Sequence, residues 1–93
     1  MPIATADLVL TAPNRLAHRG REVAVGATVY VALDALLRAG GRVATSDLCA
    51  AVWGTEEVAK RTVWSLCHRV GEKLGEVGCD LRCGTDGGDV VLT

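Results

Sequence analysis

The sequence predicts one small α+β domain that begins with a short antiparallel sheet, continues with three helices and ends with a β-hairpin. Three observations predict this class. Short apolar segments bounded by turn residues lie near both ends of the chain. Apolar residues with helical spacing occupy its middle. Finally, 93 residues suffice for only one hydrophobic core, and with 49% hydrophobic and 23% charged residues the chain is too apolar to be disordered. We therefore expect residues 1–93 to fold as a single domain.

Residues 7–25 are predicted to form the leading strands. The segment DLVLTAPN is apolar until Pro13 and Asn14 interrupt it, and Gly20 marks a turn between two extended runs in RLAHRGREVAV. Strands this close in sequence pair antiparallel. His18 is next to the turn, and we expect it at the surface.

The first helix is predicted over residues 27–39. Gly40 and Gly41 end it. Its apolar side chains recur at helical intervals, namely Tyr30, Leu33, Leu36 and Leu37. A helix with so few polar residues is expected to be covered on more than one side.

A second, shorter helix is predicted over residues 45–53 and ends before Gly54. Thr45 is expected to be its N-cap, because a threonine hydroxyl can accept a hydrogen bond from a free backbone N–H. Asp47 in the first turn suits the positive end of the helix dipole.

The third helix is predicted over residues 57–74, starting near Thr55 and its two glutamates and ending at Gly75. One stripe of apolar residues is expected to face the core: Val63, Cys67, Val70 and Leu74. The opposite stripe is polar apart from one tryptophan and contains Arg61, Trp64, Ser65, His68, Arg69 and Glu72. The helix should therefore present a largely polar side to solvent.

The closing hairpin is predicted over residues 79–93, with its turn at Gly87 and Gly88. Cys79 and Cys83 on one extended strand would lie about 13 Å apart, which is too far for a disulfide or a shared metal ion. Cys49 and Cys67 take apolar positions on their helices and are expected to be small buried residues.

Two segments of the chain, GGRVATSDLCAAVWG and KRTVWSLCHRVGEKLG, resemble the DNA-binding effector domain of OmpR/PhoB-type response regulators. VGATVYVALDALLRAGGRV is similar to the first helix of that family and its approach, and DLVLTAPNRLAHRGREVAV to its leading strands. The resemblance thus covers nearly the whole chain. It implies a winged helix-turn-helix fold, in which the third helix enters the major groove of DNA and the hairpin is the wing.

The resemblance also implies function. It suggests a small bacterial or phage transcription regulator that binds double-stranded DNA without catalysis, through residues 60–74. Since 93 residues leave no room for a receiver domain, we expect a stand-alone domain that gains affinity as a homodimer on DNA or through a partner. The candidate DNA-binding residues are Lys60, Arg61, Thr62, Trp64, Ser65, His68, Arg69, Lys73 and Arg82.

With its small net charge, the chain can bind DNA only through a local cluster of cationic side chains. The whole chain carries a formal charge of −1, so it has no general attraction for nucleic acid. On the third helix four cations, at Lys60, Arg61, Arg69 and Lys73, outweigh Glu72 and give a local charge of +3. By contrast, residues 74–93 hold four acids and one arginine, a local charge of −3. Asp86 and Asp89 in the wing are expected to repel phosphate, which leaves Arg82 as the positive candidate there.

Trp64 has three interpretations. On the polar side of the third helix, the indole could contact thymine methyl groups or sugars, form a protein interface, or fold back onto its neighbours. The second interpretation supports an alternative function, in which this face docks on an RNA polymerase subunit or another regulator.

Other function classes lack support in the sequence. Cys67 and His68 are adjacent on a helix and point about 100° apart, so they cannot form a nucleophile–base pair, and no phosphate-binding loop motif occurs. We therefore expect no enzyme activity and no cofactor. The cysteine spacing does not match a zinc site, so no metal is expected. The sequence contains no membrane-spanning apolar run, and its first arginine is Arg15, so no basic region precedes the first apolar residues. We therefore expect no secretory leader and a cytoplasmic protein.

Overall fold

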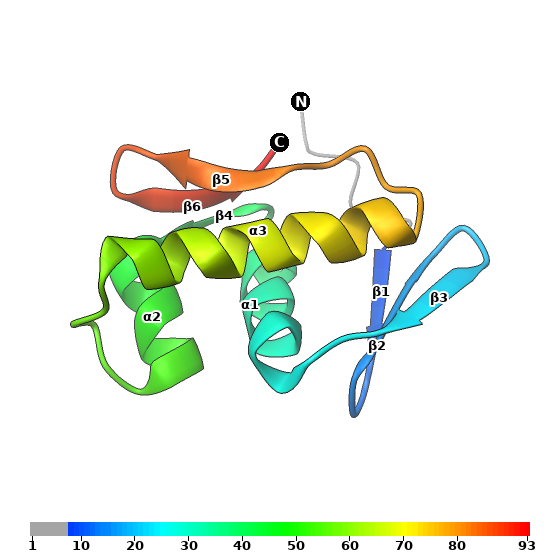
Figure 1. Ribbon diagram of the computed structural model, residues 1–93, viewed down its shortest axis with the longest axis horizontal. Coiled ribbons are helices and arrows are strands. Elements are labelled where there is room, and N and C mark those ends of the chain that lie inside the picture. The colour runs from blue at the N-terminus through cyan, green and yellow to red at the C-terminus, as the bar shows by residue number, and fades with distance from the viewer. Residues whose placement is uncertain (1–7) are drawn as a thin grey trace.

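The computed structural model describes residues 8–93 and shows an α+β domain with three helices and two small antiparallel sheets (Figure 1). The helices are α1 (Ala27–Arg38), α2 (Thr45–Trp53) and α3 (Lys60–Glu76). The strands are β1 (Leu8–Thr11), β2 (Arg15–His18), β3 (Arg21–Ala24), β4 (Arg42–Ala44), β5 (Cys83–Asp86) and β6 (Asp89–Leu92). This arrangement confirms the predicted α+β class and the predicted order of elements.

The first sheet has the order β1-β2-β3 and lies beside the carboxyl end of α3 (Figure 1). Leu8 pairs with His18 in β2, and His18 pairs with Arg21 in β3. The leading strands are confirmed from residue 8 onward, and residue 7 of the predicted segment lies outside the described residues.

The expectation that His18 lies at the surface is wrong. Its side chain is only 8% exposed, and its Nδ1 donates a hydrogen bond to the carbonyl oxygen of Val77 at 3.0 Å. Val77 directly follows α3, so this contact joins the first sheet to the end of that helix. Sequence patterns place His18 only relative to its own turn, whereas its burial depends on an element 59 residues away.

The predicted hairpin belongs to a larger sheet with the order β4-β6-β5. The additional strand, β4, pairs Val43 with Val90 of β6. With three residues it is too short to give a recognisable alternation, which explains why the sequence did not reveal it. The first strand of the hairpin begins at Cys83, so the predicted start at residue 79 is wrong.

The predicted bounds of the first two helices agree with α1 and α2 to within one residue. Thr45 is not the N-cap of α2, however. Ala44 takes that position without any side-chain cap, and the N–H of Thr45 donates instead to the carbonyl of Gly88 in the hairpin turn. The start of α2 is therefore fixed by the second sheet rather than by its own side chains.

The third helix differs from its prediction at both ends. It begins at Lys60 because Thr55 accepts a hydrogen bond at 3.2 Å from the N–H of Glu57, which forms a local turn in place of a helical start. At the other end, α3 continues through Gly75 to Glu76. Val77 is the C-cap, and Gly78 after it has a positive φ of 73°, a conformation that glycine adopts readily and that turns the chain away from the helix.

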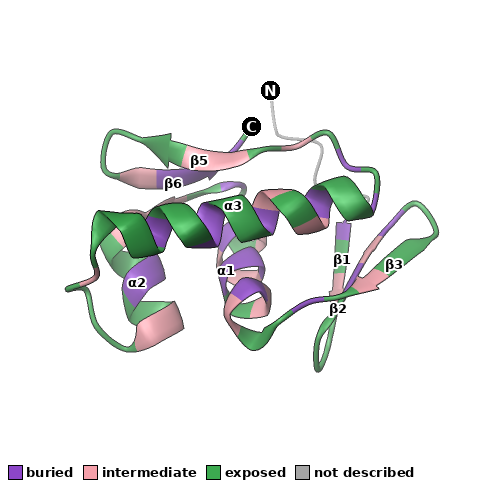
Figure 2. Ribbon diagram, viewed as in Figure 1, coloured by how far each residue is buried: buried purple, intermediate pink, exposed green. Residues whose placement is uncertain are grey.

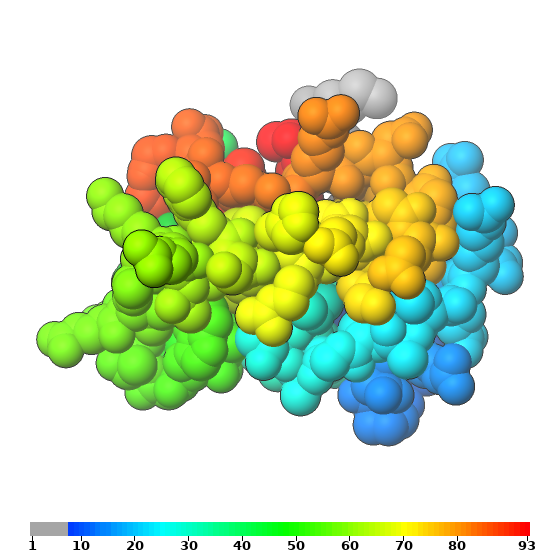
Figure 3. Space-filling model, viewed as in Figure 1, coloured from blue at the N-terminus to red at the C-terminus, as the bar shows by residue number. Residues whose placement is uncertain are grey.

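The core lies between α3 and the rest of the domain. As predicted, Val63, Cys67, Val70 and Leu74 are buried. Leu66 joins them, while the other side of α3 is exposed along most of its length (Figure 2, Figure 3). Leu33 and Leu36 of α1, Leu16 of β2 and Leu92 of β6 complete this single core. Burial of one side fixes the rotation of α3 about its axis and hence the direction of its polar residues.

We predict that His18→Ala lowers the free energy of unfolding by about 1–3 kcal/mol, because it leaves a buried carbonyl without its donor. Urea denaturation with the matched variant His68→Ala provides the comparison, since His68 is exposed. We expect little change in that control. Equal losses in the two variants would contradict the role assigned to His18.

Candidate nucleic-acid interface

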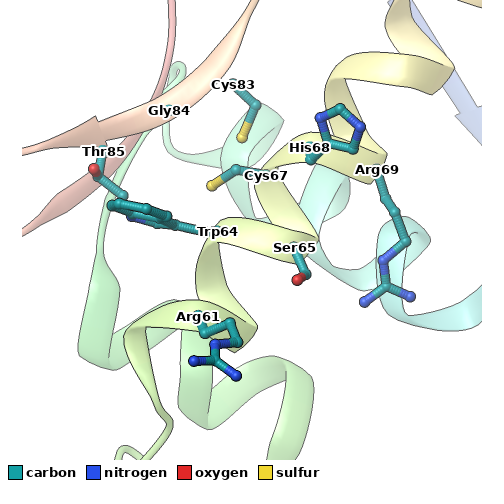
Figure 4. A pocket seen from close by; sticks show the side chains of 9 residues that line it. All are labelled: Arg61, Trp64, Ser65, Cys67, His68, Arg69, Cys83, Gly84 and Thr85. Atoms are coloured by element: carbon teal, nitrogen blue, oxygen red, sulfur yellow. The ribbon is translucent and has the colours of Figure 1, made fainter.

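An open cavity of about 650 Å³ lies between α3 and β5 (Figure 4). Six residues of α3 and three of β5 line it: Arg61, Trp64, Ser65, Cys67, His68, Arg69, Cys83, Gly84 and Thr85. Five of these are among the predicted DNA-binding residues. The structure thus gathers most of the predicted site on one concave face.

The helical repeat explains how α3 arranges these side chains. Arg61, Ser65 and Arg69 follow one another at intervals of four residues, so they form a stripe about 12 Å long on one side of the helix. In Figure 4 these three side chains point away from β5, whereas Trp64 and Cys67 extend toward it. The cavity therefore has a cationic rim and a more apolar inner wall.

The three cations at the amino-terminal and central part of α3 carry no ion pair within residues 8–93. Lys60, Arg61 and Arg69 are exposed and have no carboxylate partner there. None of the described residues that line the cavity is acidic. This face is consequently a local concentration of positive charge on a chain that is nearly neutral overall.

Two other predicted site residues are already paired. Nε2 of His68 lies 2.7 Å from Oε1 of Glu72, and Nζ of Lys73 lies 3.1 Å from Oε2 of Glu76. Lys73 is also half-buried and does not line the cavity, so it contributes less to the face than its formal charge suggests.

The remaining predicted residues lie around the cavity rather than in it. Lys60 and Trp64 line an adjacent cavity of about 390 Å³. Arg82 lines a smaller one of about 340 Å³ near His68 and Glu72. Thr62 is exposed in the first turn of α3 and is not among the residues lining any of these three cavities.

The acidic residues of the hairpin are not free, contrary to the expectation from local charge. The guanidinium of Arg42 donates to Oδ2 of Asp89 at 2.6 Å and to Oδ2 of Asp86 at 2.7 Å. These two hydrogen bonds raise the pKa of Arg42 above its ordinary value. The sequence did not reveal the pairing because it depends on β4, which brings Arg42 next to the hairpin.

The sheet register also places Asp86 and Asp89 on the face of the second sheet opposite to Thr85. Thr85 lines the cavity, and alternate residues of a strand point to opposite faces, so Asp86 points to the other face of the sheet. Asp89 is opposite Asp86 in the register and shares that face, as does Arg42, which is two residues before the partner of Asp89. Neither carboxylate lines the large cavity, although Asp89 lines the adjacent cavity together with Lys60 and Trp64.

Trp64 is the most exposed large hydrophobic side chain among those described, with 67% of its surface accessible. In Figure 4 its indole extends from α3 toward Thr85 on β5. With two thirds of its surface accessible, the indole is not folded back onto its neighbours in the way that the third interpretation requires. The other two interpretations, contact with DNA or with protein, both remain compatible with this position.

Sequence reasoning missed one feature of the cavity, the contact between Cys67 and Cys83. The thiol of Cys83 points toward Cys67 (Figure 4), and hydrogen bonding between the two thiols lowers the pKa of Cys67 and raises that of Cys83. The predicted strand placed Cys83 with Cys79 instead. Cys79 precedes β5 and is buried in the hydrophobic core.

Comparisons with protein-family models, with curated proteins and with solved structures found no match for this chain. Within residues 8–93, no group of three or more histidine, cysteine or acidic side chains is placed to hold a metal ion. In the same part of the chain, no helix combines the length and the apolar character needed to cross a membrane.

We predict that the positive charge around Trp64 is detectable by fluorescence quenching. In a Trp53→Phe variant, where Trp64 is the remaining tryptophan, the ratio of iodide to caesium quenching should be about twofold higher than for free N-acetyltryptophanamide, because Arg61 and Lys60 attract the anion. The matched Trp64→Phe variant reports Trp53 and should show a ratio closer to that of the free indole. A ratio for Trp64 equal to or below that of the free indole would contradict the charge assignment.

Proposed function

We propose that this protein binds duplex DNA through α3, as a winged helix-turn-helix transcription regulator of the OmpR/PhoB type. The observation that carries the proposal is the cavity face itself, which combines Arg61 and Arg69 with short polar side chains and is free of acidic residues within residues 8–93. Clustered cations on an exposed helix satisfy the first requirement for contact with phosphates.

Each side chain on the stripe has a role that its chemistry allows. Arg69 is long enough to form a bidentate pair with guanine or to bind a phosphate. Ser65 is short and lies between the two arginines, so it suits contact with a base edge when the helix lies in the major groove. Arg61 and Lys60, near the amino end of α3, are placed for the phosphate backbone on one side of that groove.

The hairpin would then act as the wing, with a limited contribution to affinity. Gly84 and Thr85 line the cavity and bring neutral groups next to α3. Arg42 binds Asp86 and Asp89 on the opposite face of the sheet, which reduces the repulsion that these carboxylates would exert on DNA. Since few cations are available, one protomer should bind weakly, and a homodimer on repeated half-sites would supply the missing affinity.

A second candidate function is docking on a protein, such as an RNA polymerase subunit or another regulator. The exposed indole of Trp64 favours it, because tryptophan is enriched at protein interfaces and is rarely left this accessible on a small domain. The two functions use overlapping faces of α3 but depend on different side chains.

We predict a salt dependence set by three unpaired cations. If Lys60, Arg61 and Arg69 each neutralise one phosphate, log affinity for duplex DNA should fall with log salt concentration at a slope of about −2.7. Arg69→Ala should reduce the magnitude of this slope by about 1 if the side chain binds phosphate. It should instead cost about 1–3 kcal/mol at one base position if it pairs with guanine.

The matched control is Arg38→Ala, which removes an exposed arginine on α1 that is paired with Asp34. Its affinity and slope should equal those of the unaltered protein. Salt-independent binding, or equal losses in the two variants, would contradict the proposal. Trp64→Ala separates the candidate functions, because protein docking predicts loss of partner capture while duplex affinity is unchanged.

A further inference from the structure

We propose that Cys67 and Cys83 form a dithiol modification site, which peroxide converts into a disulfide joining α3 to β5. The inference does not depend on DNA binding. It concerns a pair of nucleophilic side chains that the proposed function does not use, located at the inner wall of the cavity between these two elements.

The packing of α3 against β5 places the two cysteines next to each other. Cys67 is on the side of α3 that faces β5, and Cys83 is the first residue of β5, so the packing of helix against strand brings the two side chains together. Figure 4 shows the sulfur of Cys83 directed toward Cys67 with no side chain drawn between them. Both residues line the large cavity and the smaller one that adjoins it, so small solutes can reach the pair from solvent.

The surroundings explain which thiol reacts first. Hydrogen bonding with Cys83 lowers the pKa of Cys67 below that of an ordinary cysteine, which favours its thiolate. The same interaction together with burial raises the pKa of Cys83. Arg61 and Arg69 line the same cavity and favour negative charge there. Since the thiolate is the nucleophile, Cys67 is the attacking residue and Cys83 the resolving one.

The reaction balances with hydrogen peroxide as the oxidant. The Cys67 thiolate attacks one peroxide oxygen, the O–O bond breaks, and the leaving hydroxide takes a proton to become water, which leaves a sulfenic acid on Cys67. The sulfur of Cys83 then attacks the sulfenic sulfur, the S–S bond forms, and the S–O bond breaks. The thiol proton of Cys83 leaves with the hydroxyl group as a second water. Two electrons pass from the two thiols to one peroxide.

Two thiols can also bind a metal ion, but the residues around this pair do not provide the further ligands. Within the described part of the chain, no third histidine, cysteine or carboxylate joins the pair in a group that could hold a metal ion. Structural zinc sites use four ligands. Two facing thiols at a cavity wall therefore favour the disulfide.

The other two cysteines serve as internal controls. Cys49 is buried in α2, and burial raises the pKa of its thiol, which makes it a poor nucleophile. Cys79 is buried next to the first sheet, and like Cys49 it does not line the large cavity. Selective oxidation of the Cys67–Cys83 pair is thus the expected pattern.

The test treats the full chain with hydrogen peroxide at neutral pH, blocks the remaining thiols and digests the protein with trypsin. Cleavage after lysine and arginine puts the four cysteines on four different peptides, which span 43–60, 62–69, 74–82 and 83–93. We expect loss of two of the four thiols, a linked 62–69 and 83–93 peptide from monomeric protein, and recovery of all four thiols with dithiothreitol. A different linkage, or unchanged thiols, would overturn the proposal.

Single variants test the order of attack. Cys83→Ser keeps a hydrogen-bond donor beside Cys67 and should leave a sulfenic acid on Cys67 that dimedone labels, whereas Cys67→Ser should give at least several-fold less label on Cys83. A double variant with Cys49→Ala and Cys79→Ala keeps the pair and should still form the link. Equal or reversed labelling would overturn the assigned roles, and circular dichroism of each variant verifies that the fold is retained.

Discussion

The polar face of α3 depends on the burial of the opposite side of the helix. Val63, Leu66, Val70 and Leu74 are in the core, and together they fix how the helix is rotated about its axis. With that rotation fixed, the helical repeat requires the stripe of Arg61, Ser65 and Arg69 to point outward. Loss of the buried contacts would therefore remove the cavity face as well as stability.

The second sheet completes the face that α3 begins. β5 forms the opposite wall of the cavity, and it stays there because β6 pairs with both β5 and β4. The same sheet carries Arg42, which binds two hairpin carboxylates on the face opposite to Thr85. The large cavity is thus free of acidic lining residues, while both hairpin carboxylates are paired with Arg42. The oxidisable pair Cys67 and Cys83 lies where the helix and that layer meet, so a covalent bond there would limit movement of one cavity wall relative to the other.

The sequence predicted the features that depend on local pattern. The helical spacing of Val63, Cys67, Val70 and Leu74 identified the buried side of α3, and the bounds of α2 follow from the residues around it. The polar stripe was identified for the same reason. What local pattern cannot reveal is which distant element comes to lie beside a residue.

Four differences between the prediction and the structure arise from contacts with distant elements. His18 is buried by the segment after α3, Thr45 is fixed by the hairpin turn, Arg42 reaches two aspartates through a three-residue strand, and Cys83 faces the helix.

The most direct test of the central claim is an NMR titration of the protein with duplex DNA. The account predicts that amide shifts concentrate at residues 60–69 of α3 and 83–85 of β5, with β1–β3 unaffected. Shifts concentrated in the first sheet, or none on α3, would contradict it.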